Sequence, residues 1–203
     1  MSTLTSWGYS LAGSAVLSDL ITEQEFNTMT AGRYTGDTRI ASGIAAASLA
    51  VRNYCGWHLA GSLDCELSWT VTNRGIVKRG RDLIVQLPAR FVSAVTSVEI
   101  AGEPTTDFSL QTNGLLTIYD ARTCGRRDKI EIKYTAGITD ASFLKDLVAG
   151  MVTFMIARSP GVTSEAAGGV SVTYNSAWTN GSFDQILANN AGMLASYRLE
   201  GVF

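Results

Sequence analysis

The stretch "NYCGWHL", residues 53–59, marks the point where the hydrophobic period of the chain changes from helical to alternating. Before it, after the capping residue Asp37, apolar residues recur at the four-then-three spacing that places them on one face of a helix. Gly56 stands where a helix commonly ends in a left-handed residue. The sequence therefore predicts a helix over residues 38–55, with one apolar face formed by Ile40, Ile44, Ala47, Val51 and Tyr54.

The same stretch holds the only histidine of the chain, His58, three residues after Cys55. Nucleophilic enzymes and zinc sites both use such pairs, but a dyad needs a third orienting group and a structural zinc site needs paired ligands. Because Cys65 and Cys124 are isolated, we interpret Cys55 as a buried thiol and His58 as a partly charged residue at the helix's negative end. We predict no catalytic residue, no metal and no cofactor, with a Cys/His enzyme and a zinc module as the alternatives.

From Glu66 onward, five segments alternate apolar and polar residues, as half-buried strands do. Turn-forming sequences such as Asn113-Gly114 separate them, and no helical pattern intervenes. These features predict an antiparallel meander or a small barrel. The predicted strands are residues 66–72, 81–87, 95–101, 115–119 and 129–135.

Helical patterns lie on both sides of these strands. In "ITEQEF", residues 21–26, Thr22 and Glu25 have capping-box spacing, and Ile21 and Phe26 occupy the positions of a hydrophobic staple. A further helix is predicted after Asp140, with an apolar stripe formed by Leu144, Leu147, Val148, Met151 and Met155.

A last helix is predicted from Ser182, which has capping-box spacing with Gln185, and it carries Ile186, Leu187, Leu194 and Tyr197. The Gly-rich segment "TSEAAGG", residues 163–169, lacks the lysine of a phosphate loop, so we interpret it as a flexible connection.

These patterns predict an α+β protein: a small helical bundle with an antiparallel β-meander or barrel-like insertion between its second and third main helices. We expect an N-terminal arm over residues 1–20, a helical bundle over 21–59 and 137–203, and a β-rich insertion over 60–136.

The composition excludes several classes of protein. With 46% hydrophobic residues, 17% charged residues and a net charge of −2 over 203 residues, the chain can form a packed core but cannot grip nucleic acid over its whole surface. Its first twenty residues do not fit a secretory signal, and it contains no apolar run of bilayer length. We therefore expect a protein made in the cytoplasm, with no membrane partner.

Two groups of basic residues lie around predicted β turns. Solvated hairpin tips are one interpretation, and contact with DNA or with an acidic partner surface is the other. No aromatic residue alternates with the basic ones, which disfavours stacking on single-stranded bases. The residues are Arg74, Lys78, Arg79 and Arg81 in the first group, and Arg122, Arg126, Arg127 and Lys129 in the second.

The chain contains, in this order, "LITEQEF", the predicted helix that ends in "VRNYCGWHL", "LPARFVSAVTSVEIAG", "IEIKYTAGI" and "LKDLVAGMVTFMIARSPGVTSEAAGGVSVTYN". The order of these segments resembles that of the head–tail connector (adaptor) proteins of long-tailed double-stranded DNA phages. The resemblance spans nearly the whole chain, and "YCGWHL" with "KYTAGI" and the following helix is its most specific combination.

The resemblance implies a structural neck protein in the virion, between capsid and tail. Such proteins form a homo-oligomeric ring under the portal protein, with the portal's twelvefold symmetry, and present a platform for the next neck or tail-completion protein. DNA passes through the ring only as cargo. In this family the C-terminal segment often docks into the portal, which here implies apolar anchors at Tyr197, Leu199, Val202 and Phe203 and a polar anchor at Arg198. A head-completion or tail-terminator ring protein is the alternative within the virion.

Overall fold

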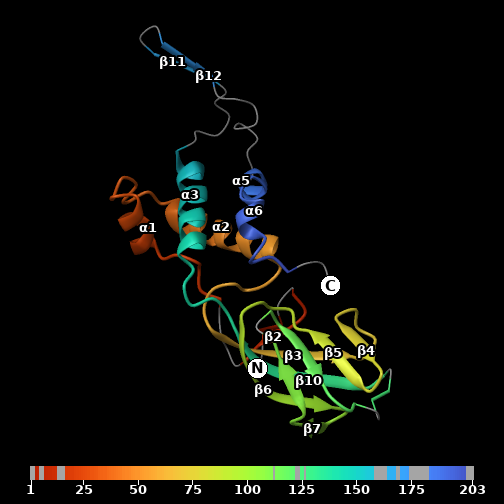
Figure 1. Ribbon diagram of the computed structural model, residues 1–203. Helices are drawn as coiled ribbons and strands as arrows, with labels where there is room; N and C mark the ends of the chain where they lie inside the picture. The colour runs from red at the N-terminus through yellow and green to blue at the C-terminus, as the bar shows by residue number, and fades with distance from the viewer. Residues whose placement is uncertain are drawn as a thin grey trace. The chain divides into compact units, whose positions relative to one another are not determined.

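A computed structural model of the chain describes residues 3–4, 7–12, 17–111, 113–121, 124–125, 127–157, 164–167, 170–173 and 183–199. It divides into two compact units, each built from separate parts of the sequence. The β unit comprises Met1–Leu17, Cys55–Asp140 and Tyr197–Phe203, and the helical unit comprises Ser18–Tyr54 and Ala141–Ser196. Their helices and strands are drawn in Figure 1.

The described residues form five helices and two larger antiparallel sheets, which confirms the predicted α+β class. The helices are α1 (Glu23–Met29), α2 (Ile40–Cys55), α3 (Ser142–Ile156), α5 (Phe183–Asn189) and α6 (Ala191–Leu194). The strands of the β unit are β1 (Thr3–Leu4), β2 (Ser10–Leu11), β3 (Leu63–Thr70), β4 (Ile76–Arg79), β5 (Asp82–Gln86), β6 (Val92–Ile100), β7 (Glu103–Thr105), β8 (Phe108–Leu110), β9 (Leu115–Ile118) and β10 (Lys129–Ala136). The helical unit adds a hairpin of β11 (Ser164–Ala167) and β12 (Val170–Thr173).

The apolar face of α2 forms the centre of the helical unit. Four of its five predicted members are buried, and Tyr54 is half-buried. Gly43 lets α3 approach closely, since a Cβ atom at this position would lie 3.3 Å from a methyl carbon of Val152. Burial of the apolar stripes of α2 and α3 therefore supplies most of the stabilisation of this unit.

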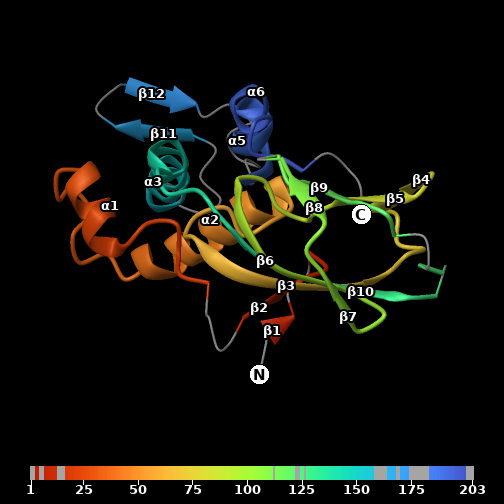
Figure 2. The ribbon, with the colours of Figure 1, turned by 60° about the horizontal axis from the view of Figure 1, so that its bottom comes forward.

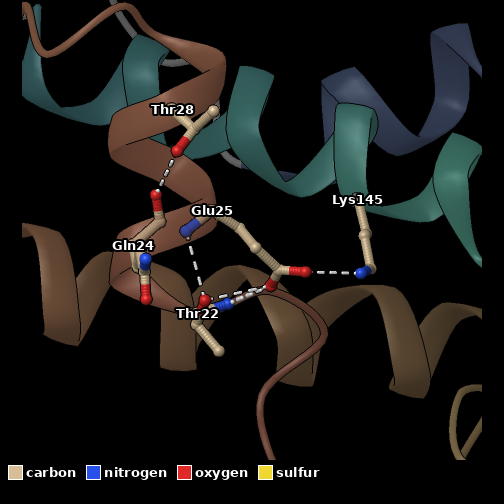
Figure 3. Close-up of polar contacts among 5 residues, drawn as sticks. All are labelled: Thr22, Gln24, Glu25, Thr28 and Lys145. Carbon is tan, nitrogen blue, oxygen red and sulfur yellow. Dashed lines mark hydrogen bonds and ion pairs between the residues drawn. The ribbon is translucent and has the colours of Figure 1, made fainter.

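Helix α1 begins as its sequence predicts. The Thr22 hydroxyl accepts the Glu25 N–H at 3.1 Å, and the Glu25 carboxylate accepts the Thr22 N–H at 2.8 Å, which completes the capping box. The other carboxylate oxygen of Glu25 lies 2.6 Å from Nζ of Lys145 on α3 (Figure 3). One side chain thus both caps α1 and ties it to α3.

The order of strands in the β unit differs from that of a simple meander. The six-stranded sheet runs β1-β2-β3-β10-β6-β7, and the four-stranded sheet runs β4-β5-β9-β8. Strand β10 is the last strand of the β unit in sequence, yet it lies between β3 and β6 and pairs with both (Figure 2). It alternates buried and outward residues along its whole length because it is the centre of a sheet with one buried face.

Local structure also departs from the sequence-based expectations in several helical and loop segments. Helix α2 begins at Ile40, although Asp37 still accepts the Arg39 N–H as a helix-capping residue does. The predicted last helix is two helices, separated at Asn190, and Tyr197 follows them in a turn; Ser182 lies outside the described residues. The Gly-rich segment that we interpreted as a connection contains β11, which pairs with β12.

The Glu25 contacts predict a pH dependence of stability. Hydrogen bonding to Lys145 and, to a smaller extent, to the Thr22 backbone lowers the pKa of Glu25 from 4.5 to about 2. Because the folded-state pKa is the lower one, the stabilisation is fully present above pH 4.5 and is lost as the pH falls toward 2. Unfolding by urea at several pH values should therefore show that Glu25→Gln destabilises the protein near neutral pH but not near pH 2. Its side chain is 39% exposed, so solvent screening keeps the effect small.

Glu23 provides the matched control, since it lies in the same helical turn and its carboxylate makes no ion pair or hydrogen bond within the described residues. Glu23→Gln should leave the pH dependence in this window unchanged. Equal behaviour of the two variants would contradict the role assigned to Glu25.

Candidate functional site

Residues 56–59, which we call the α2 turn, follow the last residue of α2 and confirm that "NYCGWHL" is a helix end. Gly56 has φ +81°, a conformation that favours glycine because it has no Cβ. Trp57, His58 and Leu59 are fully buried in the β unit. The chain therefore leaves the helix and enters the β core within these four residues.

His58 makes hydrogen bonds at both ring nitrogens. Nε2 lies 2.9 Å from the carbonyl oxygen of Ala136 on β10, which can only accept, so Nε2 carries a proton. Nδ1 lies 2.7 Å from the Tyr9 hydroxyl, and this hydroxyl also accepts the His58 backbone N–H at 3.1 Å. The neutral Nε2–H tautomer satisfies these contacts, with Nδ1 accepting the Tyr9 O–H. The ring links the N-terminal segment to the central strand.

The cysteines do not have the properties of nucleophiles. Burial raises the pKa of Cys55 to about 12, against the opposing influence of the Arg198 charge. Burial likewise raises the pKa of Cys65 to about 12 and lifts that of Cys124 above its ordinary value. A reactive cysteine is a thiolate, so these thiols do not suit nucleophilic chemistry. Within the described ranges, no three His, Cys, Asp or Glu residues are arranged to hold a metal ion.

The segment Tyr197–Leu199, part of the predicted portal anchor, lies against the α2 turn. Its backbone makes three hydrogen bonds within the β unit. Trp57 Nε1 donates to the Tyr197 carbonyl at 2.6 Å, the Leu199 N–H donates to the Cys55 carbonyl at 2.9 Å, and Arg90 donates to the Arg198 carbonyl at 3.1 Å. Val202 and Phe203, the other predicted anchors, lie outside the described residues.

A row of aromatic rings accompanies these hydrogen bonds. Phe91 stacks on Trp57 at a centroid distance of 6.1 Å and contacts Tyr197, also at 6.1 Å. Phe91 has φ +55°, is 43% exposed, and so presents an apolar ring beside the C-terminal segment. Sequence reasoning did not find Tyr9, Arg90 or Phe91, because no local pattern marks a residue whose partner lies so far away in the chain.

The two basic groups are brought to the same end of the β unit. Lys78 Nζ donates to the Cys124 carbonyl at 2.9 Å, which joins the β4–β5 hairpin to the segment before β10. The Val71 N–H donates to the Asp128 carbonyl, so the turn that carries Arg74 also lies beside this segment. Lys129 pairs with Glu131 at 2.9 Å. Arg74, Arg79, Arg81 and Arg127 are exposed, and Arg122 and Arg126 lie outside the described residues.

Two open grooves border α3 in the helical unit. One is lined by residues of α1 and α3 that include Met29 and Asp146, and the other by residues of α3 and α5 that include Phe154 and Ile186. Neither groove has the enclosed apolar shape with converging polar groups of a small-molecule site. None of the helices in the described part of the chain has the length and hydrophobicity needed to span a membrane.

Comparison with known proteins identifies the family to which this chain belongs. Residues 19–191 match the head completion protein family, so the match covers most of both units. The chain belongs to this family of structural phage proteins of the head–tail connector type, as its sequence indicated. It is a virion component with a structural role in completing the phage head, where it meets other head and tail proteins. No curated protein matches the chain.

The buried Tyr9–His58 contact predicts that Tyr9→Phe and Tyr134→Phe, two substitutions in the same core, change the free energy of unfolding by different amounts. Tyr9→Phe removes the hydroxyl that serves both Nδ1 and the backbone N–H of His58, and should lower the free energy of unfolding by about 1–3 kcal/mol. The Tyr134 hydroxyl has no hydrogen-bond partner of good geometry within the described residues, and Cys65, opposite it on β3, offers only a weakly bonding thiol.

Tyr134→Phe should therefore change the free energy of unfolding by less than about 0.5 kcal/mol, as measured by urea denaturation. If Tyr9→Phe were as mild as Tyr134→Phe, the hydrogen bonds of His58 would not contribute to stability.

The hydrogen bond from the Trp57 indole to Tyr197 leads to a prediction about the stability of the segment Tyr197–Leu199 against local opening. Trp57→Phe keeps an aromatic ring but removes the donor to Tyr197, and loss of about 1 kcal/mol should speed hydrogen exchange of the Leu199 amide roughly fivefold. Trp69→Phe is the matched control, because the Trp69 indole donates to Gly8 instead. Unchanged exchange at Leu199 in Trp57→Phe would contradict the anchoring role of the indole.

Proposed function

We propose that this protein is a head–tail adaptor that forms a ring under the portal, extends the DNA channel and provides the docking platform for the next neck or tail protein. The ring has the portal's symmetry, which we expect to be twelvefold. The helical segments form the connector core, and the β-rich part is an insertion that offers a further contact surface. Membership of the head completion protein family supports a place in the virion neck.

The outward face of α2 is the observation that carries this proposal. Ala41, Ser42, Ala45, Ala46 and Leu49 lie on this face and are exposed, Leu49 to 56%. None is charged, although exposed helix faces of monomeric proteins are ordinarily rich in charge. An exposed face of small and apolar residues suits close packing against another subunit.

The chemistry of the described residues supports a structural rather than a catalytic role. The cysteines are buried as neutral thiols, and His58 is engaged through both ring nitrogens. A modest net charge of −2 also suits a channel wall, because dense neutralisation of phosphates would hold the DNA in place.

Residues beyond Leu199 are proposed to enter the portal. Tyr197–Leu199, directly before these residues in the sequence, are fastened to the β unit through their backbone. The side chains of Tyr197, Arg198 and Leu199 are proposed as further anchors.

Native mass spectrometry of the protein mixed with the portal ring of its own phage tests the proposal. We expect one copy per portal subunit, and loss of the complex in Phe203→Ala combined with Val202→Ala. Met193→Ala is the matched control, since Met193 is 59% exposed on α6 and outside the proposed anchor. Leu49→Glu should prevent ring formation without unfolding the subunit.

A different result would favour the alternative. If the protein bound tail components and ignored the portal, a different virion ring protein, a head-completion ring that does not contact the portal or a tail terminator, would replace the adaptor. The family match favours this alternative over an enzyme, because its description names head completion.

A further inference from the structure

Three arginines on and around β4 carry charge that the described part of the chain does not neutralise. Arg74 precedes β4, Arg79 ends it and Arg81 lies in the turn to β5, and all three are exposed. Their guanidinium groups make no hydrogen bond or ion pair within the described residues, in contrast to Lys78 and Lys129. By sequence, residues 71–82 and 120–129 together hold eight Lys or Arg and only three Asp or Glu.

Three carboxylates on and beside β7 show the opposite imbalance. Glu99 lies across from Pro104 of β7, Glu103 begins β7, and Asp107 lies between β7 and β8. Their side chains have no ion pair or hydrogen-bond partner in the described ranges, whereas Glu25, Glu66 and Glu131 all face lysines. Residues 99–107 contain three acidic residues and no Lys or Arg.

The two groups lie on and beside different edge strands of the β unit, although the basic segment 120–129 reaches the acidic group at Lys129, whose carbonyl accepts the Ala101 N–H. β4 and β8 are the two edges of the four-stranded sheet, and β7 is an edge of the six-stranded sheet. Because only two residues join β7 to β8, both of these strands belong to the same side of the β unit. We call Arg74, Arg79 and Arg81, on and around β4, the basic edge. We call Glu99, Glu103 and Asp107 the acidic edge; of these, Asp107 directly precedes β8, at the opposite edge of the four-stranded sheet from β4 (Figure 2), and Glu99 and Glu103 lie on β6 and β7 of the six-stranded sheet.

We propose that the basic edge of one copy of this chain binds the acidic edge of a second copy, head to tail. The inference rests on the proposed ring, and it names the surfaces through which neighbouring β units meet. A contact between two different patches of identical subunits repeats around a closed ring, which a symmetric contact between identical patches does not do. Each subunit then satisfies on its neighbour the charges that its own fold leaves unpaired.

The chemistry of the two edges favours this partner. Guanidinium groups bind carboxylates through paired, charge-assisted hydrogen bonds, and Val77, 59% exposed on β4, adds apolar contact at the centre of the basic edge. The charged residues on β4 oppose backbone pairing of the two edges, so the contact is made by side chains. Duplex DNA is the less suitable partner, because it would not neutralise the acidic edge.

Reversing the charges of each edge separately tests the proposal. One variant is Arg74→Glu with Arg81→Glu, and the other is Glu103→Arg with Asp107→Arg; all four positions are exposed and lie in turns or on an edge strand. We expect sedimentation velocity of the wild-type protein to show concentration-dependent association that weakens with salt. Each variant alone should be monomeric, since like charges then meet.

Mixing the two variants in equal amounts should restore association, because each reversed edge now meets its complement on the other variant. A chain with all four substitutions should also associate, and it retains the wild-type net charge. Arg33→Glu, in the helical unit, is the control and should behave as wild type. A monomeric wild type at low ionic strength, association of either variant alone, or a mixture that stays monomeric would overturn the proposal.

These outcomes are separate from those of the portal experiment. Self-association that follows the edge charges, with no binding to the portal, would leave this contact standing and remove the adaptor role. Portal binding by both reversed variants at full stoichiometry would leave the adaptor role standing and remove this contact. Binding of short duplex DNA by a wild type that stays monomeric, abolished by Arg74→Glu with Arg81→Glu, would overturn the contact and assign the basic edge to DNA.

Discussion

The β unit depends on the way the α2 turn holds segments from both ends of the described chain. Tyr9 approaches it from the N-terminal side and bonds to His58, while Tyr197 and Leu199 approach from the C-terminal side and bond to Trp57 and Cys55. These bonds are buried or half-buried, where an unmade hydrogen bond costs more than a made one gains. The turn thus joins segments that are more than a hundred residues apart in sequence.

Helices and individual strands were predictable, because their causes are local. The capping box of Thr22 and Glu25 and the apolar face of α2 can be written down from spacing alone, and both are present. β4 was missed because its burial does not alternate, with Ile76 its one buried residue, and β1, β2, β7 and β8 were missed because they have only two or three residues each. The placement of β10 between β3 and β6 could not be foreseen, since the sequence indicates a strand but not its neighbours.

For the candidate site as well, local features could be predicted from the sequence and long-range contacts could not. "NYCGWHL" could be identified as a helix end because Gly56 and the apolar stripe are local features, yet nothing nearby in sequence named Tyr9 or Ala136 as partners of His58. The basic residues were visible as two groups, but only the hydrogen bond from Lys78 to Cys124 shows that the fold unites them. The partners of His58 and the union of the two basic groups depend on long-range contacts, and a single sequence contains no pattern that indicates such contacts.

The discontinuous make-up of the β unit has a consequence for the order of events during folding. β3 gains its neighbour β10 only after some sixty further residues have been added, and the α2 turn gains Tyr197 only after more than a hundred and thirty. Closing such long loops is slow, because entropy is lost before the contacts that compensate for it can form. The helix entry at Thr22, whose contacts are local, can form first, whereas the surface around Phe91 is completed among the last steps. A growing chain therefore exposes unfinished strand edges for much of its synthesis.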